Sequence, residues 1–230
     1  MEKTSSKFIL ANWKSNKTLE EALQWIDEIQ QAISQTQHTI VLFPPFPFLA
    51  PLREKVARLQ LPMQLGTQTL SPFPAGAYTG AVNVRNLEGL DVKYALIGHS
   101  ERRKYFHESN QDIANAAMLA VENGITPVVC VYKDIIWSQA NALEEKVRAQ
   151  SLVLFETPEN IGTGVMQSLD EVLENVREVR KAFGNSAKFI YGGSVGMHQS
   201  PAEFLDHQEI DGIVAGTASL DSQSFIKLLK

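Results

Sequence analysis

Apolar and polar residues follow one order along the whole chain: a short apolar run is followed by a longer stretch with helical periodicity. Most of the short runs are nearly continuous, which is typical of strands that are covered on both faces. We predict eight strands, at residues 8–11, 39–43, 63–67, 94–98, 125–131, 152–155, 188–191 and 212–215.

The stretches between these runs predict amphipathic helices. After Thr18, apolar residues recur every three or four positions, and Thr18 with Glu21 forms a capping-box pattern for the helix start. Ser168 and Glu171 repeat the pattern before a second amphipathic stretch, which we expect to end at Gly184. Two more helices are predicted at residues 110–123 and 219–229. The segments after the third and seventh strands are short and weakly patterned.

Eight strand-then-helix units in 230 residues indicate the architecture. Continuous alternation of strands and helices predicts an α/β fold with a parallel sheet. An open, doubly wound sheet fits the alternation too, but eight units in this length favour closure into a (β/α)8 barrel. No composition shift or linker divides the chain, so we expect a single domain over residues 1–230. In such barrels the active site lies where the strands end at their carboxyl side.

Charge and cysteine content exclude several classes of partner. The net charge is −5 and acids and bases are interspersed, so we expect neither nucleic acid nor a membrane surface as a partner. No segment approaches the roughly 18–20 apolar residues of a membrane span, and residues 1–7 lack the apolar stretch of a signal peptide. Cys130 is the single cysteine, which fits a reducing compartment. A cytoplasmic protein is therefore expected.

Polar residues follow the first and fourth predicted strands at their carboxyl ends. Asn12 and Lys14 are two positions apart, so their side chains point to the same side. A lysine in that place is costly unless an anion meets it, although it can also extend to solvent. His99 begins a polar segment that can start a helical turn, where a helix N-terminus keeps the ring neutral and able to donate to a carbonyl. A structural histidine is the alternative.

Further candidates follow the last three strands. Glu156 comes directly after the sixth strand, and a carboxylate that is partly removed from water is a suitable general base. An ordinary acid before a turn is the alternative. Gly162 and Gly164 permit a backbone that approaches a phosphate and a loop that moves. Glycine-rich turns at residues 192–194 and 216–217 precede helix starts, whose free amides suit an anion.

Taken together, five stretches resemble the triosephosphate isomerase family. They lie in the expected order, and the similarity spans nearly the whole chain. The His-Ser-Glu-Arg-Arg stretch at residues 99–103 is the most specific of them. The five stretches are residues 12–14, 76–80, 97–103, 161–164 and 191–195.

The resemblance implies a reaction and a role for each site residue. The family interconverts glyceraldehyde 3-phosphate and dihydroxyacetone phosphate by proton transfer through an enediolate, in glycolysis and gluconeogenesis, and we expect no metal or cofactor. Glu156 would be the base and neutral His99 the electrophile. Both roles are taken from the family, whose glutamate and histidine are a standard example of pKa values adjusted by the protein. Lys14 would stabilise the enediolate and the phosphate. Asn12 would donate a hydrogen bond, and Glu101 would orient Lys14. Phosphate-binding amides are expected at Gly162, Ser194, Gly216 and Thr217.

The chain departs from the family in the lid and around one arginine. Thr157 follows the base, Pro158 comes next and Glu159 stands where the family usually has tryptophan, so the lid looks like the short lids of archaeal members. The acids that normally hold the first arginine of residues 99–103 are absent. We therefore predict that Arg102 pairs with another acid, Glu108.

A long segment after the third strand predicts an interface. Residues 68–80 carry Phe73 and Tyr78, and apolar side chains on a protruding loop are costly unless they dock. In the family this loop inserts beside the lysine of a partner subunit. A homodimer is therefore expected, and a tetramer, as in short archaeal relatives, remains compatible.

Two other functions fit parts of the pattern. The first is another sugar-phosphate isomerase or lyase on the same barrel, since phosphate sites are shared among such enzymes. The second is a non-catalytic binding protein derived from the barrel. The joint presence of Lys14, His99 and Glu156 favours the isomerase over both.

Overall fold

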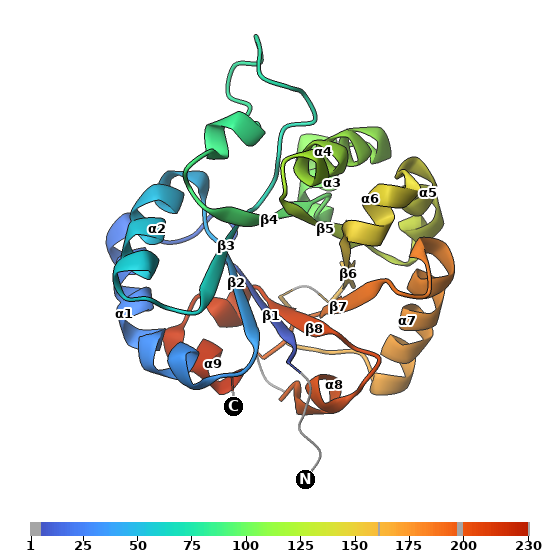
Figure 1. Cartoon of the computed structure of the whole chain (residues 1–230). Helices are drawn as coiled ribbons and strands as arrows, with labels where there is room; N and C mark the ends of the chain where they lie inside the picture. Colours follow the sequence, from blue (N-terminus) through green and yellow to red (C-terminus); the bar gives the residue numbers. More distant parts are fainter. Residues whose placement is uncertain (1–5, 161, 197–199, 230) are drawn as a thin grey trace.

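Eight parallel strands close into a barrel in chain order (Figure 1). The computed structural model describes residues 6–160, 162–196 and 200–229, so Ile161 of the predicted lid motif lies outside the described residues. The first strand pairs with both the second and the eighth, which rules out an open sheet and confirms the (β/α)8 barrel. The strands are β1 (Phe8–Asn12), β2 (Thr39–Phe43), β3 (Met63–Thr67), β4 (Val92–Ile97), β5 (Thr126–Val131), β6 (Leu152–Glu156), β7 (Lys188–Gly192) and β8 (Gly212–Ala215).

Helices form a ring outside the barrel (Figure 1). After β3 comes a 3₁₀ helix in place of an α-helix, in agreement with the weak pattern of that segment. The α-helices are α1 (Leu19–Gln35), α2 (Leu49–Arg58), α3 (Ser100–Phe106), α4 (Asn110–Glu122), α5 (Ile136–Ala142), α6 (Glu145–Gln150), α7 (Leu169–Phe183), α8 (Ala202–Asp206) and α9 (Ser222–Lys227). The 3₁₀ helices are η1 (Phe46–Phe48), η2 (Val84–Leu87), η3 (Lys133–Ile135) and η4 (Thr217–Ser219).

Local capping signals place the helix ends. Both predicted capping boxes, at the starts of α1 and α7, are confirmed, and Gly184 ends α7 at φ 113°, a conformation that favours glycine. The predicted helix at 219–229 is wrong at its start. The Asp221 side chain accepts the Ser224 N–H at 2.8 Å, so this acid caps a new helix after η4.

The strands are covered by apolar side chains on both faces, inside the barrel and outside it. The barrel interior is filled by side chains such as Leu10, Val128 and Cys130, whereas the outer faces of the strands pack against the helices. Trp13 turns outward, where its Nε1 donates to the Ser219 carbonyl at 3.2 Å. Its neighbours in the chain, Asn12 and Lys14, consequently face the mouth of the barrel.

Within the described ranges, no helix combines the length and the apolar character that crossing a bilayer requires.

Candidate active site

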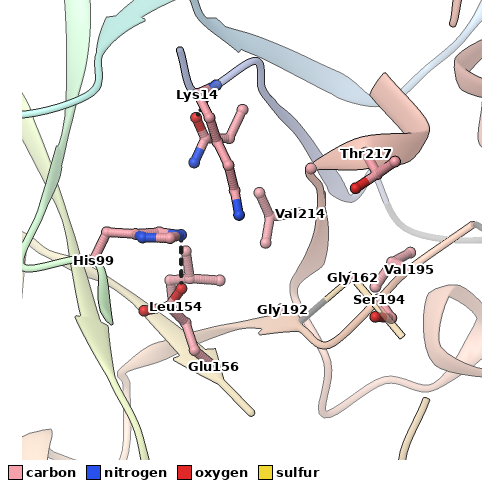
Figure 2. Close-up of a pocket in the computed structure, with 12 residues that line it drawn as sticks. Lys14, His99, Leu154, Glu156, Gly162, Gly192, Ser194, Val195, Val214 and Thr217 are labelled. Carbon is pink, nitrogen blue, oxygen red and sulfur yellow. Dashed lines mark hydrogen bonds and ion pairs between the residues drawn. The ribbon is translucent and has the colours of Figure 1, made fainter. Parts of the chain in front are cut away.

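A cavity of about 50 Å³ lies at the carboxyl ends of the strands (Figure 2). Eight of the nine predicted site residues line it, and the ninth, Glu101, reaches the site through its contact with Lys14. The eight are Asn12, Lys14, His99, Glu156, Gly162, Ser194, Gly216 and Thr217.

Both ring nitrogens of His99 have a hydrogen-bond partner. His99 is the N-cap of α3, and its Nδ1 accepts the Glu101 backbone N–H at 3.2 Å. Because Nδ1 is an acceptor, the neutral ring carries its proton on Nε2. That nitrogen lies 2.9 Å from Oε1 of Glu156.

Glu156 is the last residue of β6, and its side chain is only 3% exposed. Its Oε2 accepts the Ser100 backbone N–H at 2.9 Å, and the Ser100 hydroxyl lies 3.4 Å from Oε1. Sequence reasoning did not find Ser100. Its position in the first turn of α3 could have indicated it, because the backbone N–H groups of a first helical turn have no acceptor within the helix and are free to bind a carboxylate.

Lys14 occupies a strained backbone conformation with φ 51°. Its Nζ lies 2.5 Å from Oε1 of Glu101, and its N–H donates to Oδ1 of Asn12 at 3.0 Å. The side-chain amide of Gln68 donates to the carbonyls of Lys14 and Phe43, at 2.8 and 2.9 Å. A non-glycine residue at positive φ costs about 1–3 kcal/mol, and these bonds offset that strain. Gln68 was also missed, because nothing around it in the sequence relates it to the first strand.

The lid, residues 157–167, is fastened to the segment that ends β7. The Gly164 N–H donates to the Ser194 hydroxyl at 3.2 Å, and the Gln167 N–H donates to the Tyr191 hydroxyl at 2.9 Å. Burial raises the pKa of Tyr191, so the hydroxyl stays protonated. Gly162 lines the cavity, so this part of the lid contributes to its wall (Figure 2).

The departures from the family pattern have distinct surroundings. Thr157 is buried, whereas Pro158 and Glu159 are exposed. A Cβ on Gly193 would lie 2.6 Å from the Thr157 hydroxyl oxygen, so only glycine fits beside this hinge. Thr217 starts η4 directly after Gly216.

The predicted ion pair outside the cavity is confirmed. Nε of Arg102 lies 2.5 Å from Oε1 of Glu108. Glu108 thus takes the place of the acids that are absent from this chain.

An imidazole, a carboxylate and an ammonium from three separate strands meet at one lidded mouth. Among the described residues, no group of three or more His, Cys, Asp or Glu side chains is arranged to hold a metal ion. The fold and the site define a barrel enzyme of the acid–base type, with glycine-rich turns that suit a small anion.

Comparison with known proteins gives the family. A model of the triosephosphate isomerase family matches residues 7–230. The triosephosphate isomerase of Chromohalobacter salexigens is 34% identical, with 96% of each chain covered. That of Thermus thermophilus is 32% identical over 96% of this chain and 97% of its own, and that of Mesomycoplasma hyorhinis is 32% identical over 98% of each. The chain belongs to the triosephosphate isomerase family.

Proposed function

We propose that this protein is the isomerase that interconverts glyceraldehyde 3-phosphate and dihydroxyacetone phosphate, a step of glycolysis and gluconeogenesis. Membership of the family and the names of its relatives support this activity. The observation that carries it is the meeting of Lys14, His99 and Glu156 at one cavity, with 2.9 Å between the imidazole and the carboxylate.

In the proposed mechanism, Glu156 takes a proton from the carbon next to the substrate carbonyl. The electrons of that C–H bond form the carbon–carbon double bond of an enediolate, and the carbonyl electrons move onto oxygen. Nε2–H of His99 donates to this oxygen and then relays a proton between the two substrate oxygens. Glu156 returns its proton to the neighbouring carbon. Placed acid–base groups of this kind contribute roughly 10²–10⁴-fold to a rate.

The remaining residues would bind charge. The Lys14 ammonium faces the developing enediolate and the phosphate, Asn12 donates a further hydrogen bond, and Glu101 orients Lys14. Backbone amides would hold the phosphate, and the lid would exclude water from the reactive intermediate. These amides belong to Gly162, Ser194, Gly216 and Thr217.

Substrate binding requires a rearrangement of the base. A carbonyl oxygen cannot enter between His99 and Glu156 while their side chains are 2.9 Å apart. We infer that Glu156 leaves the Ser100 N–H and rotates toward the substrate carbon, so that His99 is free to donate to the substrate.

The proposed assembly is a homodimer through residues 68–80. This loop projects from the barrel between β3 and η2 (Figure 1). Phe73 and Tyr78 stack with their ring centroids 4.6 Å apart, and each is 43% exposed. Removing these two exposed rings from water would favour docking of the loop on a partner subunit. By analogy with the family, the loop would lie beside Lys14 of the partner subunit. A tetramer would extend the same assembly.

Two further proposals concern the chain as a whole. We propose a cytoplasmic location, which the single cysteine, free and buried, supports. We also propose that residues 1–230 form one domain.

A coupled assay of glyceraldehyde 3-phosphate conversion tests the function. We expect the wild type to be active and Glu156→Gln to lose roughly 10²–10⁴-fold in kcat, because the amide cannot take up the proton. Glu156→Asp, which shortens the base, should lose activity as well. Equal activity in these proteins would exclude Glu156 as the base, and a wild type that prefers another sugar phosphate would favour the alternative isomerase or lyase.

A further inference from the structure

The turn between β4 and α3, together with the first residues of α3, supplies three groups to the site: His99, the Ser100 N–H and Glu101. Arg103 bonds to the backbone of this turn. Nε of Arg103 donates to the Gly98 carbonyl at 2.8 Å, immediately before His99. Gly98 is itself at φ 77°, so this carbonyl marks the point where the chain leaves the strand.

The other end of the same guanidinium is held by two amides. Nη1 of Arg103 donates to Oδ1 of Asn110 at 2.7 Å, and Nη2 donates to Oε1 of Gln139 at 2.7 Å. Nη2 also lies 3.4 Å from the Cys130 carbonyl. Arg103 therefore ties the catalytic turn to α4, to α5 and to the end of β5.

Gln139 is a fully buried polar member of this network. It lies on α5 with 0% of its surface exposed, and its Nε2 donates to the Asn110 carbonyl at 3.3 Å. A buried amide is costly unless both of its ends are bonded, and here both are. Gln139 therefore has one conformation, which in turn fixes Arg103.

Each of the four groups that accept from Arg103 is electrically neutral. A carboxylate would be the usual partner of a half-buried guanidinium, but Glu108, which is nearby, already binds Arg102. Burial lowers the pKa of Arg103, and Cys130 and Tyr132, if ionised, and the carboxylates of Glu156 and Glu108 act against this. Burial raises the pKa of the Cys130 thiol, so it stays uncharged at neutral pH. The titratable groups near Glu156 are His99, Lys14, Arg103, Cys130 and Tyr132. Neutral acceptors leave the positive charge of Arg103 uncancelled on the side of Glu156.

We propose that Gln139 is a positioning residue of the active site, which holds Arg103 under the β4–α3 turn without neutralising it. The hydrogen bonds fix the place of His99 and of the Ser100 N–H. The charge that remains acts on the site through Glu156, which is among the groups that interact with this guanidinium. This inference rests on the proposed function for its kinetic consequences, although not for its structural ones.

The test changes the residues that accept hydrogen bonds from Arg103, so that the charge of the acceptor and its ability to accept are altered in separate variants. Gln139→Glu keeps the shape and adds a negative charge, and Asn110→Asp does the same at the first residue of α4, where a helix accommodates an acid. Gln139→Met keeps a similar volume but removes the acceptor. Gln31→Glu, on the exposed face of α1, is the matched charge control. Thermal unfolding identifies the variants that are folded.

Two readouts distinguish positioning from a merely structural role. The first is the pH profile of kcat/KM, and the second is the backbone amide shift of Ser100, which reports the ionisation of the carboxylate that it binds. For Gln139→Glu and Asn110→Asp we expect both midpoints to rise by on the order of one pH unit, because a like charge near a carboxylate disfavours its ionised form. Gln139→Met should lower kcat by about 10–100-fold through misplacement, with the midpoint unchanged.

Either of two results would overturn the proposal. In the first, both acidic variants keep the wild-type midpoint; in the second, Gln139→Met moves the midpoint as far as they do. If the wild type does not isomerise triose phosphates, the proposed function fails, whereas the Ser100 amide titration still decides whether Gln139 and Arg103 act on the carboxylate.

Discussion

His38 is a single residue whose protonation affects the whole fold. Its Nδ1 accepts the Lys7 backbone N–H at 3.3 Å. Burial, and after it the charge of Lys7, lower the pKa of His38 below its ordinary value of 6.5. The folded state thus prefers the neutral ring, whereas the unfolded chain binds a proton more readily. Stability is therefore complete above pH 6.5 and is lost as the pH falls from there through the lowered pKa of the folded state.

We predict that His38→Asn reduces this acid sensitivity. Asparagine retains an acceptor for Lys7 but does not titrate. Urea unfolding at about pH 7.5 and about pH 5.5 should show a smaller fall in midpoint for the variant than for the wild type. His107→Asn is the matched control, because His107 is exposed and asparagine tolerates its left-handed conformation. Equal falls in the wild type and His38→Asn would contradict the prediction.

At the residue scale, most of the residues that line the cavity could be predicted, whereas the residues that support them could not. His99 and Glu156 follow directly on strands, and Asn12 and Lys14 share a side because strand side chains alternate. Ser100, Gln68 and Gln139 act through contacts with residues far away in the chain, such as the 56 positions between Ser100 and Glu156. No local pattern distinguishes them from other polar residues.

At the scale of elements, α7 depends on the cap that its first residues form. The Ser168 hydroxyl accepts the Glu171 N–H at 3.4 Å, and the Glu171 carboxylate accepts the Ser168 N–H at 2.9 Å. The helix follows the lid anchor at Gln167, so its start also sets where the lid ends.

Ser168→Ala is therefore predicted to reduce the free energy of unfolding by about 1 kcal/mol, because a backbone N–H loses its acceptor. Urea unfolding measures the loss. Ser34→Ala serves as the control, since the Ser34 hydroxyl bonds only a carbonyl within α1 and caps nothing. If Ser168→Ala is as stable as Ser34→Ala, the capping box of α7 contributes nothing to the free energy of unfolding.

The strands and most helices were predictable because their signals are local. The predicted strands agree with the observed ones to within one or two residues. The largest difference is at the start of β4, which begins at Val92 because Val92 already pairs with Leu65 of β3; at its other end, Gly98 leaves the strand at positive φ. The last helix was the exception. Helical periodicity suggested one helix across Asp221, but this residue caps a new helix through its bond to the Ser224 N–H.

At the scale of the whole molecule, the exposed ring pair of Phe73 and Tyr78 predicts association. Sedimentation should find a dimer or larger species in the wild type and monomers in the double variant Phe73→Ser, Tyr78→Ser, because the apolar contact area is lost. Leu19→Ser removes a side chain of similar exposure, 41%, from α1 and should leave the assembly unchanged. A monomeric wild type would refute the proposed interface.

The sequence by itself determined the elements, their order and the strand ends that carry the reacting groups, since these follow from period, caps and turn residues within a few positions. Eight units already favoured closure, and the pairing of β1 with β8 confirms it. Only the tertiary structure decided that the imidazole of His99 lies 2.9 Å from the carboxylate of Glu156, and that neutral amides hold Arg103 behind the turn. The reason is physical. Side-chain contacts depend on distances between segments far apart in the chain, and packing of the barrel with its helices sets those distances.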